Sequence, residues 1–315
     1  MPRMVEGKRF DRFASWKMTR LAFWLGRHFP AAHRWMMYNV FSSTMLKAWG
    51  EIEPQYRLDH NPYYSTNVAA MMVNDDLVPA LRNDRIESVS GIKRIIGEKS
   101  VELDDGAVLD NIDAIVACVG YHTPFEPVGE AIRFSRPHPS CPPQPDLFQN
   151  VFALDYPDSL AFLNYIVLYD SAATCRELAA MAIAQIWAGK SSLPSRRAMQ
   201  AQIESRHSWY IQKCVNEPVK QPEGLVDADS WLRFMHDKAG TGVYDHFGWT
   251  LKGLWFSLRH PLLYLAMAYG VNTPHLNRYF DTGKRKWWSG AEAAIWNINE
   301  LSKLDLASSP DVKSD

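Results

Sequence analysis

The segment of residues 100–121 constrains the fold more than any other part of this chain. Its first half alternates apolar and acidic residues around Asp104-Asp105-Gly106, a pattern that predicts a β-hairpin with glycine in its turn. The run Ile112–Val119 is then mostly apolar, which is typical of a strand covered on both faces. Ligands in open α/β sheets lie beyond the carboxyl ends of strands. The sequence therefore predicts an α/β fold with a ligand-binding turn at Gly120-Tyr121.

Composition narrows the class of protein. The 315 residues are 47% hydrophobic and 22% charged, which is ordinary for a globular chain of roughly two domains. A formal net charge of -1 gives no field toward nucleic acid, so no nucleic-acid partner is expected. Cys118, Cys141, Cys175 and Cys214 contain no C-x-x-C spacing, and we interpret them as reduced thiols in a cytoplasmic protein, with no disulfide frame or metal site.

Residues 1–50 predict two amphipathic helices that are interrupted at Phe29-Pro30 and carry a solvated basic face. An alternative is that some of these arginines face the phosphate of an anionic cofactor. The alternating residues Ile86–Ile96 predict a strand before the hairpin. The proline-rich residues 122–148 predict a surface connection.

Residues 151–190 form a second informative unit. Val151–Leu154 and Leu160–Ile166 predict short strands, and the alanine-rich residues 172–188 predict a helix that ends at Gly189. A strand, a turn of small residues and a helix N-terminus together hold anionic or hydrogen-bonding edges of ligands. Asp170 and Ser171 stand at that turn, so they are candidate cofactor-binding residues.

The C-terminal third predicts packed helices over residues 197–217, 230–239, 251–258 and 262–269, the second of them capped by Asp229. The last two are apolar and aromatic, and a membrane-surface or partner-binding face is the alternative to simple packing. Residues 262–271 are too short for the ~20 apolar residues of a membrane span. His236 and His246 match no metal-binding spacing, and we interpret them as surface polar residues.

Four segments resemble, in the same order, motifs of the flavin-containing monooxygenase family. They are V-N-D-D-L-V-P of residues 73–79, D-N-I-D-A-I-V-A-C-V-G-Y of residues 110–121, residues 160–195 with E-L at 177–178 and L-P-S at 193–195, and residues 274–295 with W-W-S-G-A at 287–291. The second segment is similar to the family's D-x-(V/I)-I-x-A-T-G-Y, with Val119 in place of the threonine.

The resemblance implies an incomplete two-dinucleotide-binding-domain flavoprotein fold of the α/β class, with a small strand region and a largely helical C-terminal part. Residues 1–96 would be the C-terminal remnant of an NADPH-binding domain with a helical insertion, and residues 97–195 the C-terminal part of an FAD-binding domain. A helical region, 196–306, and a disordered tail, 307–315, would follow. The implied cofactors are FAD and NADPH, and the implied binding residues are Asn74, Asp75, Cys118, Val119, Gly120, Tyr121, Asp170 and Ser171. Asp75 can equally be a plain helix N-cap.

The chain contains no G-x-G-x-x-G, although the family carries one such motif for the pyrophosphate of each dinucleotide. We therefore expect a monooxygenase lineage, acting with NADPH and O₂ on a soft nitrogen or sulfur nucleophile or a ketone, but an inactive isolated chain. It would be one part of a longer or split flavoprotein, with an N-terminal half or a second copy as partner. The alternative is a non-catalytic interaction module, and no residue identifies the small-molecule substrate.

Overall fold

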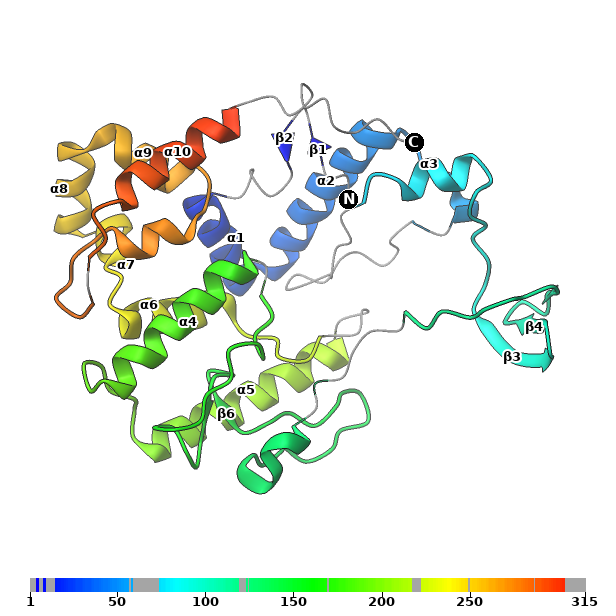
Figure 1. Ribbon diagram of the computed structural model, residues 1–315, viewed down its shortest axis with the longest axis horizontal. Coiled ribbons are helices and arrows are strands. Elements are labelled where there is room, and N and C mark those ends of the chain that lie inside the picture. Colours follow the sequence, from blue (N-terminus) through cyan, green and yellow to red (C-terminus); the bar gives the residue numbers. More distant parts are fainter. Residues whose placement is uncertain are drawn as a thin grey trace.

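The computed structural model describes residues 4–5, 8–9, 15–56, 58, 74–118, 123, 125–168, 170–216, 222–248, 250–285 and 287–303. These residues form a body of packed helices from which a small β-hairpin projects, at the opposite end of the molecule from α8 (Figure 1). The α-helices are α1 (Trp16–His28), α2 (Pro30–Trp49), α3 (Leu77–Arg82), α4 (Ala172–Trp187), α5 (Arg196–Asn216), α6 (Ala228–Ala239), α7 (Val243–Phe247), α8 (Leu251–Arg259), α9 (Pro261–Tyr269) and α10 (Ala291–Lys303).

The described strands are short and pair only antiparallel. They are β1 (Met4–Val5) with β2 (Lys8–Arg9), β3 (Ile92–Gly97) with β4 (Ser100–Leu103) and β5 (Val108–Leu109), and β6 (Leu147–Phe148) with β7 (Phe152–Ala153). Short 3₁₀ turns lie at Pro54–Tyr56, Glu126–Ala131 and Pro274–Arg278. The described residues thus form both helices and strands, and many more of them lie in helices than in strands.

The helix predictions are confirmed. Phe29 ends α1, and Pro30 occupies the first position of α2, where its missing N–H costs no hydrogen bond. The alanine-rich helix α4 ends at Ala188, and Gly189 follows in the left-handed region with φ 69°, as a C′ glycine does. α8 and α9 are separated at His260-Pro261, as the proline predicts.

The main core lies where α4 packs against α6. Leu178 of α4 and Trp231, Leu232 and Met235 of α6 are almost completely buried, together with Phe152 of β7. The indole Nε1 of Trp231 donates to the Gln149 carbonyl at 2.9 Å, so its polar edge is satisfied inside the core. A second cluster joins α1, through Trp16, to α7, α8, α9 and α10. Helices supply most of the residues of both clusters, so the helical body is stabilised by its own packing.

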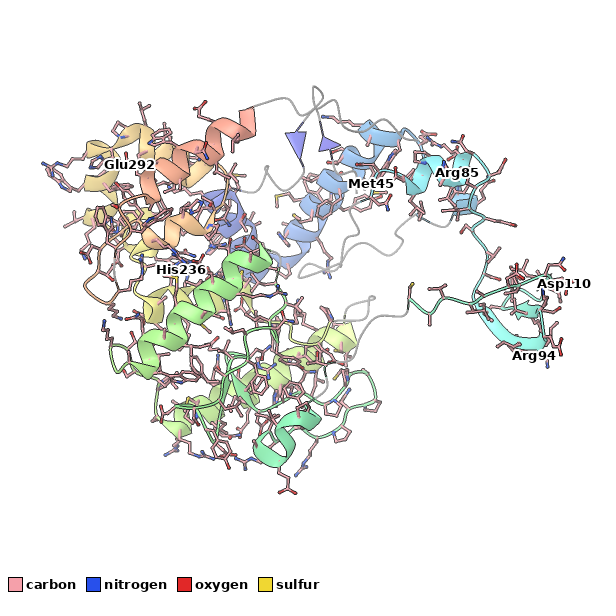
Figure 2. All side chains as sticks on the ribbon, in the orientation of Figure 1. Met45, Arg85, Arg94, Asp110, His236 and Glu292 are labelled. Carbon is pink, nitrogen blue, oxygen red and sulfur yellow. The ribbon has the colours of Figure 1, made fainter. Side chains whose placement is uncertain are left out.

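The hairpin is confirmed at its turn. Gly106 has φ 86°, and Val101 and Leu103 are buried while β3 is exposed along its length. Arg94 and Asp110 lie on this projecting unit, away from the helices (Figure 2). Lys93 and Arg94 both bind the Glu102 carboxylate, at 2.7 and 2.6 Å. Ion pairs and a few apolar contacts therefore stabilise this unit, instead of a shared core.

The prediction of a buried strand at Ile112–Val119 is wrong for its described part, residues 112–118. This part is irregular and largely exposed, and Val116 has 80% of its surface open. A strand covered on both faces needs hydrogen-bonding neighbours. The Ile112 N–H donates to the Lys99 carbonyl at 3.0 Å, but no ladder continues beyond it among the described residues. The apolar side chains of this part therefore remain largely exposed to solvent.

Three smaller predictions also need correction. Leu160–Ile166 is not a strand, because only Ala161 within it forms a bridge, to Phe152. The N-cap residue of α6 is Asp227, while Asp229 lies buried in the first turn and binds Arg233 at 3.1 Å. The expected tail 307–315 lies outside the described residues. The division of the chain at residues 96, 195 and 306 stays a prediction.

Candidate functional site

The predicted turn at Asp170 and Ser171 stands at the N-terminus of α4. The Ser171 hydroxyl accepts from the Thr174 N–H at 3.5 Å, which caps the helix. One carboxylate oxygen of Asp170 accepts from the Ser171 N–H at 2.7 Å and from the Asn272 amide at 2.9 Å. The structure thus brings both predicted residues together, and it links them to a segment 102 residues further along the chain.

Arg20 of α1 supplies the charge that balances Asp170. Its Nη1 donates to the other carboxylate oxygen at 2.9 Å, and both side chains are buried. Burial disfavours the charged guanidinium, but the Tyr244 hydroxyl and the Asp170 carboxylate outweigh it and raise the pKa of Arg20. Arg20 is therefore buried in an internal ion pair, and the expectation of a fully solvated basic face is wrong at this position.

The position of Arg20 in the sequence indicates that its side chain is buried, although its charge suggests a surface position. Trp16, Arg20 and Phe23 follow one another at spacings of four and three, so they share one face of α1. Trp16 is buried and Phe23 packs against the main core. An arginine on such a stripe needs a buried carboxylate, but nothing local in the sequence identifies that carboxylate as Asp170, which is 150 residues away.

The α4 terminus has limited capacity for an anionic ligand. The Asp170 charge is balanced there by Arg20, so the pair leaves no net positive charge to attract a phosphate. The Thr174 hydroxyl oxygen, in the first turn of α4, is buried without a hydrogen-bond partner. The arrangement suits a neutral hydrogen-bonding edge better than a pyrophosphate.

Asn74 and Asp75 lie before the six-residue helix α3, far from α4 (Figure 1). The Asn74 side-chain oxygen accepts from the N–H groups of Asp76 and Leu77, at 2.7 and 2.9 Å. Asn74 therefore performs the capping that the sequence assigned to Asp75, which corrects that prediction. The structure does not join this pair to Asp170 and Ser171, and a role in binding a cofactor stays a prediction for both residues.

The third group of predicted residues is Cys118, Val119, Gly120 and Tyr121. Cys118 is exposed at the end of the irregular segment 112–118. Val119, Gly120 and Tyr121 lie outside the described residues, so their predicted cofactor contact stays a prediction. All four cysteines are free thiols, as the sequence predicts.

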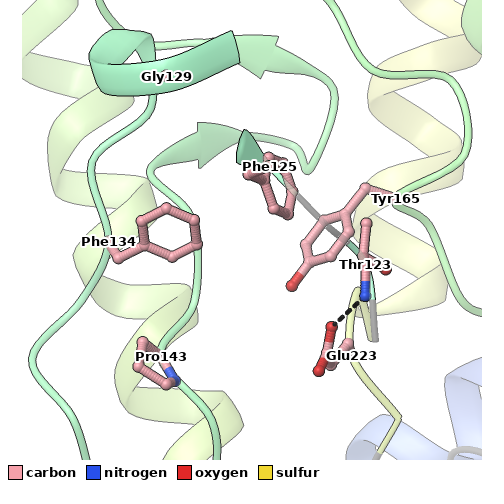
Figure 3. A pocket seen from close by; sticks show the side chains of 7 residues that line it. All are labelled: Thr123, Phe125, Gly129, Phe134, Pro143, Tyr165 and Glu223. Carbon is pink, nitrogen blue, oxygen red and sulfur yellow. Dashed lines mark hydrogen bonds between the residues drawn. The ribbon is translucent and has the colours of Figure 1, made fainter. Parts of the chain in front are cut away.

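A pocket of about 250 Å³ lies just beyond this segment, between Phe125, Phe134, Tyr165 and Glu223 (Figure 3). The Phe125 ring stands edge-on to those of Phe134 and Tyr165, with centroids 5.5 and 5.2 Å apart. The Thr123 N–H donates to the Glu223 carboxylate at 3.4 Å. Burial, and then the Glu223 charge, raise the pKa of Tyr165, which stays neutral. At about 250 Å³ the pocket lies just below the ~300–1,000 Å³ that is typical of small-molecule and cofactor sites.

Of the two histidines assigned to the surface, His236 is buried and His246 is partly exposed. His236 is buried on α6 (Figure 2), where its Nδ1 lies 2.7 Å from the Thr241 hydroxyl. Burial lowers the pKa of His236 well below its ordinary value, and the Arg20 charge lowers it further. The His246 ring stacks on Phe280 with centroids 3.9 Å apart. Among the described residues no group of three or more metal-ligating side chains gathers, and both histidines contact neighbouring side chains.

Comparison with known proteins identifies the lineage. The family model for flavin-binding monooxygenase-like proteins matches residues 13–307. The chain belongs to this family. It is 32% identical over 308 residues to monooxygenase aurF of Gibberella zeae, which covers 95% of this chain and 57% of that protein.

More distant relatives come from mammals. Identity is 23% over 298 residues to flavin-containing monooxygenase 5 of Cavia porcellus, covering 90% of this chain and 51% of that protein. It is 23% over 261 residues to dimethylaniline monooxygenase [N-oxide-forming] 4 of Oryctolagus cuniculus, covering 81% and 43%. The chain thus spans about half the length of the curated relatives that it matches.

Membership makes the chain part of an oxidoreductase lineage of flavoproteins that use FAD and NADPH, and its mixed helices and strands are compatible with an α/β flavoprotein fold. The residues present do not by themselves fit either dinucleotide. The sequence lacks the glycine-rich motif that holds the pyrophosphate of each dinucleotide in the family, and the Asp170 carboxylate stands at the N-terminus of α4. No described helix is long and apolar enough to cross a bilayer.

Proposed function

We propose that this chain is the C-terminal part of an FAD- and NADPH-dependent monooxygenase, and that alone it does not oxidise NADPH. The observation that carries the proposal is the exposed apolar segment 112–118, whose sequence is that of a covered strand. This segment resembles the family motif at which the chain passes from the NADPH domain back into the FAD domain. A half that carries the glycine-rich motifs would supply the missing sheet neighbours and the pyrophosphate cradles.

The residues of this chain would position the cofactor, and the cofactor would supply the chemistry. The Arg20–Asp170–Asn272 cluster fixes the N-terminus of α4, and the Thr174 hydroxyl is buried there without a hydrogen-bond partner. When bound, the flavin would supply the oxygen transfer, and the protein would orient it and exclude water. For the substrate we propose a soft nitrogen or sulfur nucleophile, with a ketone as the alternative. The N-oxide-forming activity in the name of the rabbit relative supports the first of these.

Complementation tests the proposal. The 315-residue chain is mixed with a separately produced N-terminal half of a flavin-containing monooxygenase, chosen to carry both glycine-rich motifs. We expect a complex that binds FAD and oxidises NADPH, while this chain alone does neither. Failure of the two halves to form any complex would count against the split-flavoprotein form of the proposal.

A non-catalytic interaction module is the second candidate. The exposed edge strand β3 favours it. Ile92, Ile95 and Ile96 are all exposed on this strand, and such a strand is a template for pairing with another chain. Under this reading the chain would bind a protein through β3 and would not acquire flavin from any added half. The complementation experiment therefore separates the two candidates.

A further inference from the structure

The helical pair α8–α9 presents an apolar surface on its outer side as well as its inner side. Inward, Phe256, Leu263 and Met267 are buried in the second core cluster. Outward, large apolar side chains are exposed on both helices: Leu251, Leu254, Trp255, Leu258, Leu262, Leu265 and Tyr269. Surface helices of globular proteins ordinarily turn polar residues outward. We call these seven residues the outer ridge.

The outer ridge follows helical geometry. Leu251, Leu254 and Leu258 recur at spacings of three and four, so they share one face of α8. On α9, Leu262, Leu265 and Tyr269 recur in the same way. The exposed fractions reach 87% for Leu251 and 71% for Leu262. α8 lies at the edge of the molecule opposite the β3–β4 hairpin (Figure 1), so the ridge is remote from the segment that awaits a flavoprotein half.

The two helices of the ridge carry basic and no acidic side chains, and the nearest carboxylates in the sequence are Asp245 and Asp281. Lys252, Arg259 and His260 are exposed on or between the two helices, and no aspartate or glutamate occurs from residue 246 to residue 280. The Arg259 guanidinium lies over the Trp255 ring, 4.9 Å from its centroid. The carboxylate of Glu292, on the neighbouring α10, accepts from the Tyr279 hydroxyl at 3.5 Å. Leucines, a tryptophan and a tyrosine flanked by cations are the side chains that enter the headgroup region of a bilayer.

We propose that the outer ridge docks on an anionic lipid surface, with α8 and α9 lying in the plane of the interface. Leucines and Trp255 would enter the boundary between headgroups and acyl chains, and Lys252 and Arg259 would bind lipid phosphates and carboxylates. A nine-residue helix is about 14 Å long, which suits lying on a bilayer and not crossing it. A second copy of the chain fits less well, because a two-fold pairing of ridges brings the same cations together.

Vesicle flotation tests the proposal with the purified 315-residue chain. We expect binding to vesicles of phosphatidylcholine with about 30% phosphatidylserine, and about tenfold weaker binding to pure phosphatidylcholine. Raising the salt from about 0.05 to 0.5 M should weaken the binding, because it screens the lysine and arginine contacts. Binding that ignores both lipid charge and salt would contradict the electrostatic part of the proposal.

Paired variants locate the surface. Leu254→Glu with Leu262→Glu should lower vesicle binding at least about tenfold, which corresponds to about 1.4 kcal/mol. The matched control, Trp35→Glu with Leu46→Glu, places two carboxylates at exposed apolar positions of α2 and should change binding less than about twofold. Equal losses in both variants would overturn the assignment, because they would indicate a general effect of charge.

Lys252→Glu with Arg259→Glu removes the cations and keeps the apolar ridge, so it should weaken binding to anionic vesicles only. Circular dichroism confirms that each variant folds, and this second variant keeps the test valid if the leucine variant does not fold. No vesicle binding by the folded chain, with self-association that Leu254→Glu abolishes in sedimentation, would overturn the proposal in favour of a second copy as occupant.

Discussion

The α4–α6 body and the unit of β3, β4 and β5 with the following segment 112–118 contain similar apolar residues, but these are buried in the first and mostly exposed in the second. Leu178, Trp231 and Met235 are closed off from solvent, whereas Ile95 and Val116 are largely exposed. The body brings its own partners, because α4 packs directly on α6. The hairpin unit buries little beyond Val101 and Leu103. The difference teaches that one region buries its apolar residues within this chain, whereas the other leaves most of them exposed to solvent.

The largest expected effect lies in the body. Trp231→Ala should lower the free energy of unfolding by about 4 kcal/mol, because it leaves a cavity in the α4–α6 core and removes the bond to Gln149. Urea denaturation followed by circular dichroism measures this. Trp35→Ala, at an exposed tryptophan of α2, is the control and should change stability by about 0.5 kcal/mol or less. Equal effects would erase the distinction between packed and open surfaces.

The ion pair of Arg20 and Asp170 comes next. Asp170→Asn leaves the guanidinium buried without a counter-charge and should lower stability by about 3 kcal/mol. Asp113→Asn breaks the exposed pair with Lys99 on the hairpin side and should be without measurable effect. Denaturation curves of both variants compare how much the buried pair of the body and the exposed pair beside the hairpin contribute to stability. A stable Asp170→Asn protein would mean that the pair does not fix α4.

The buried His236 should make the body sensitive to acid. Its pKa is lowered in the folded state, so the unfolded chain takes up a proton first as the pH falls below about 6.5. Stability is then lost by up to about 1.4 kcal/mol per pH unit, and it is fully present above that pH. His236→Gln should flatten this part of the curve when urea midpoints are compared between pH 7 and pH 5. An unchanged slope would show that other groups carry the acid sensitivity.

The smallest effect is expected at the hairpin end. Val116→Ser should change the stability of the isolated chain by about 0.5 kcal/mol or less, because the side chain already faces solvent. In the complementation experiment the same variant should weaken binding of the N-terminal half, because Val116 would then be covered. A variant that is neutral in both assays would remove segment 112–118 from the proposed interface.

Much of the helical body could be predicted from sequence, because proline, glycine and apolar spacing act locally. Pro30 and Gly189 mark helix boundaries by backbone geometry alone. The polarity of His236 predicts a surface position, but its place on α6 predicts burial. It follows Trp231, Leu232 and Met235 on one buried stripe of the helix. The histidine shows that a helical stripe predicts burial better than residue type does.

The candidate site could be predicted only in part. Ser171 was found because a small residue before an alanine-rich helix is a local signal. The partners of Asp170, namely Arg20 and Asn272, are separated from it by 150 and 102 residues, and no local pattern links them. The apolar run at 112–118 predicts a strand that the structure does not form, because apolar sequence alone does not supply hydrogen-bonding neighbours.

Titration of the purified 315-residue chain with FAD tests the central claim most directly. Flavin fluorescence reports binding, and near-ultraviolet circular dichroism reports that the chain is folded. The account predicts a folded chain with no saturable FAD binding, since the pyrophosphate cradles are absent from its sequence. Tight, stoichiometric binding of FAD would contradict it, and would mean that this chain alone builds a complete flavin site.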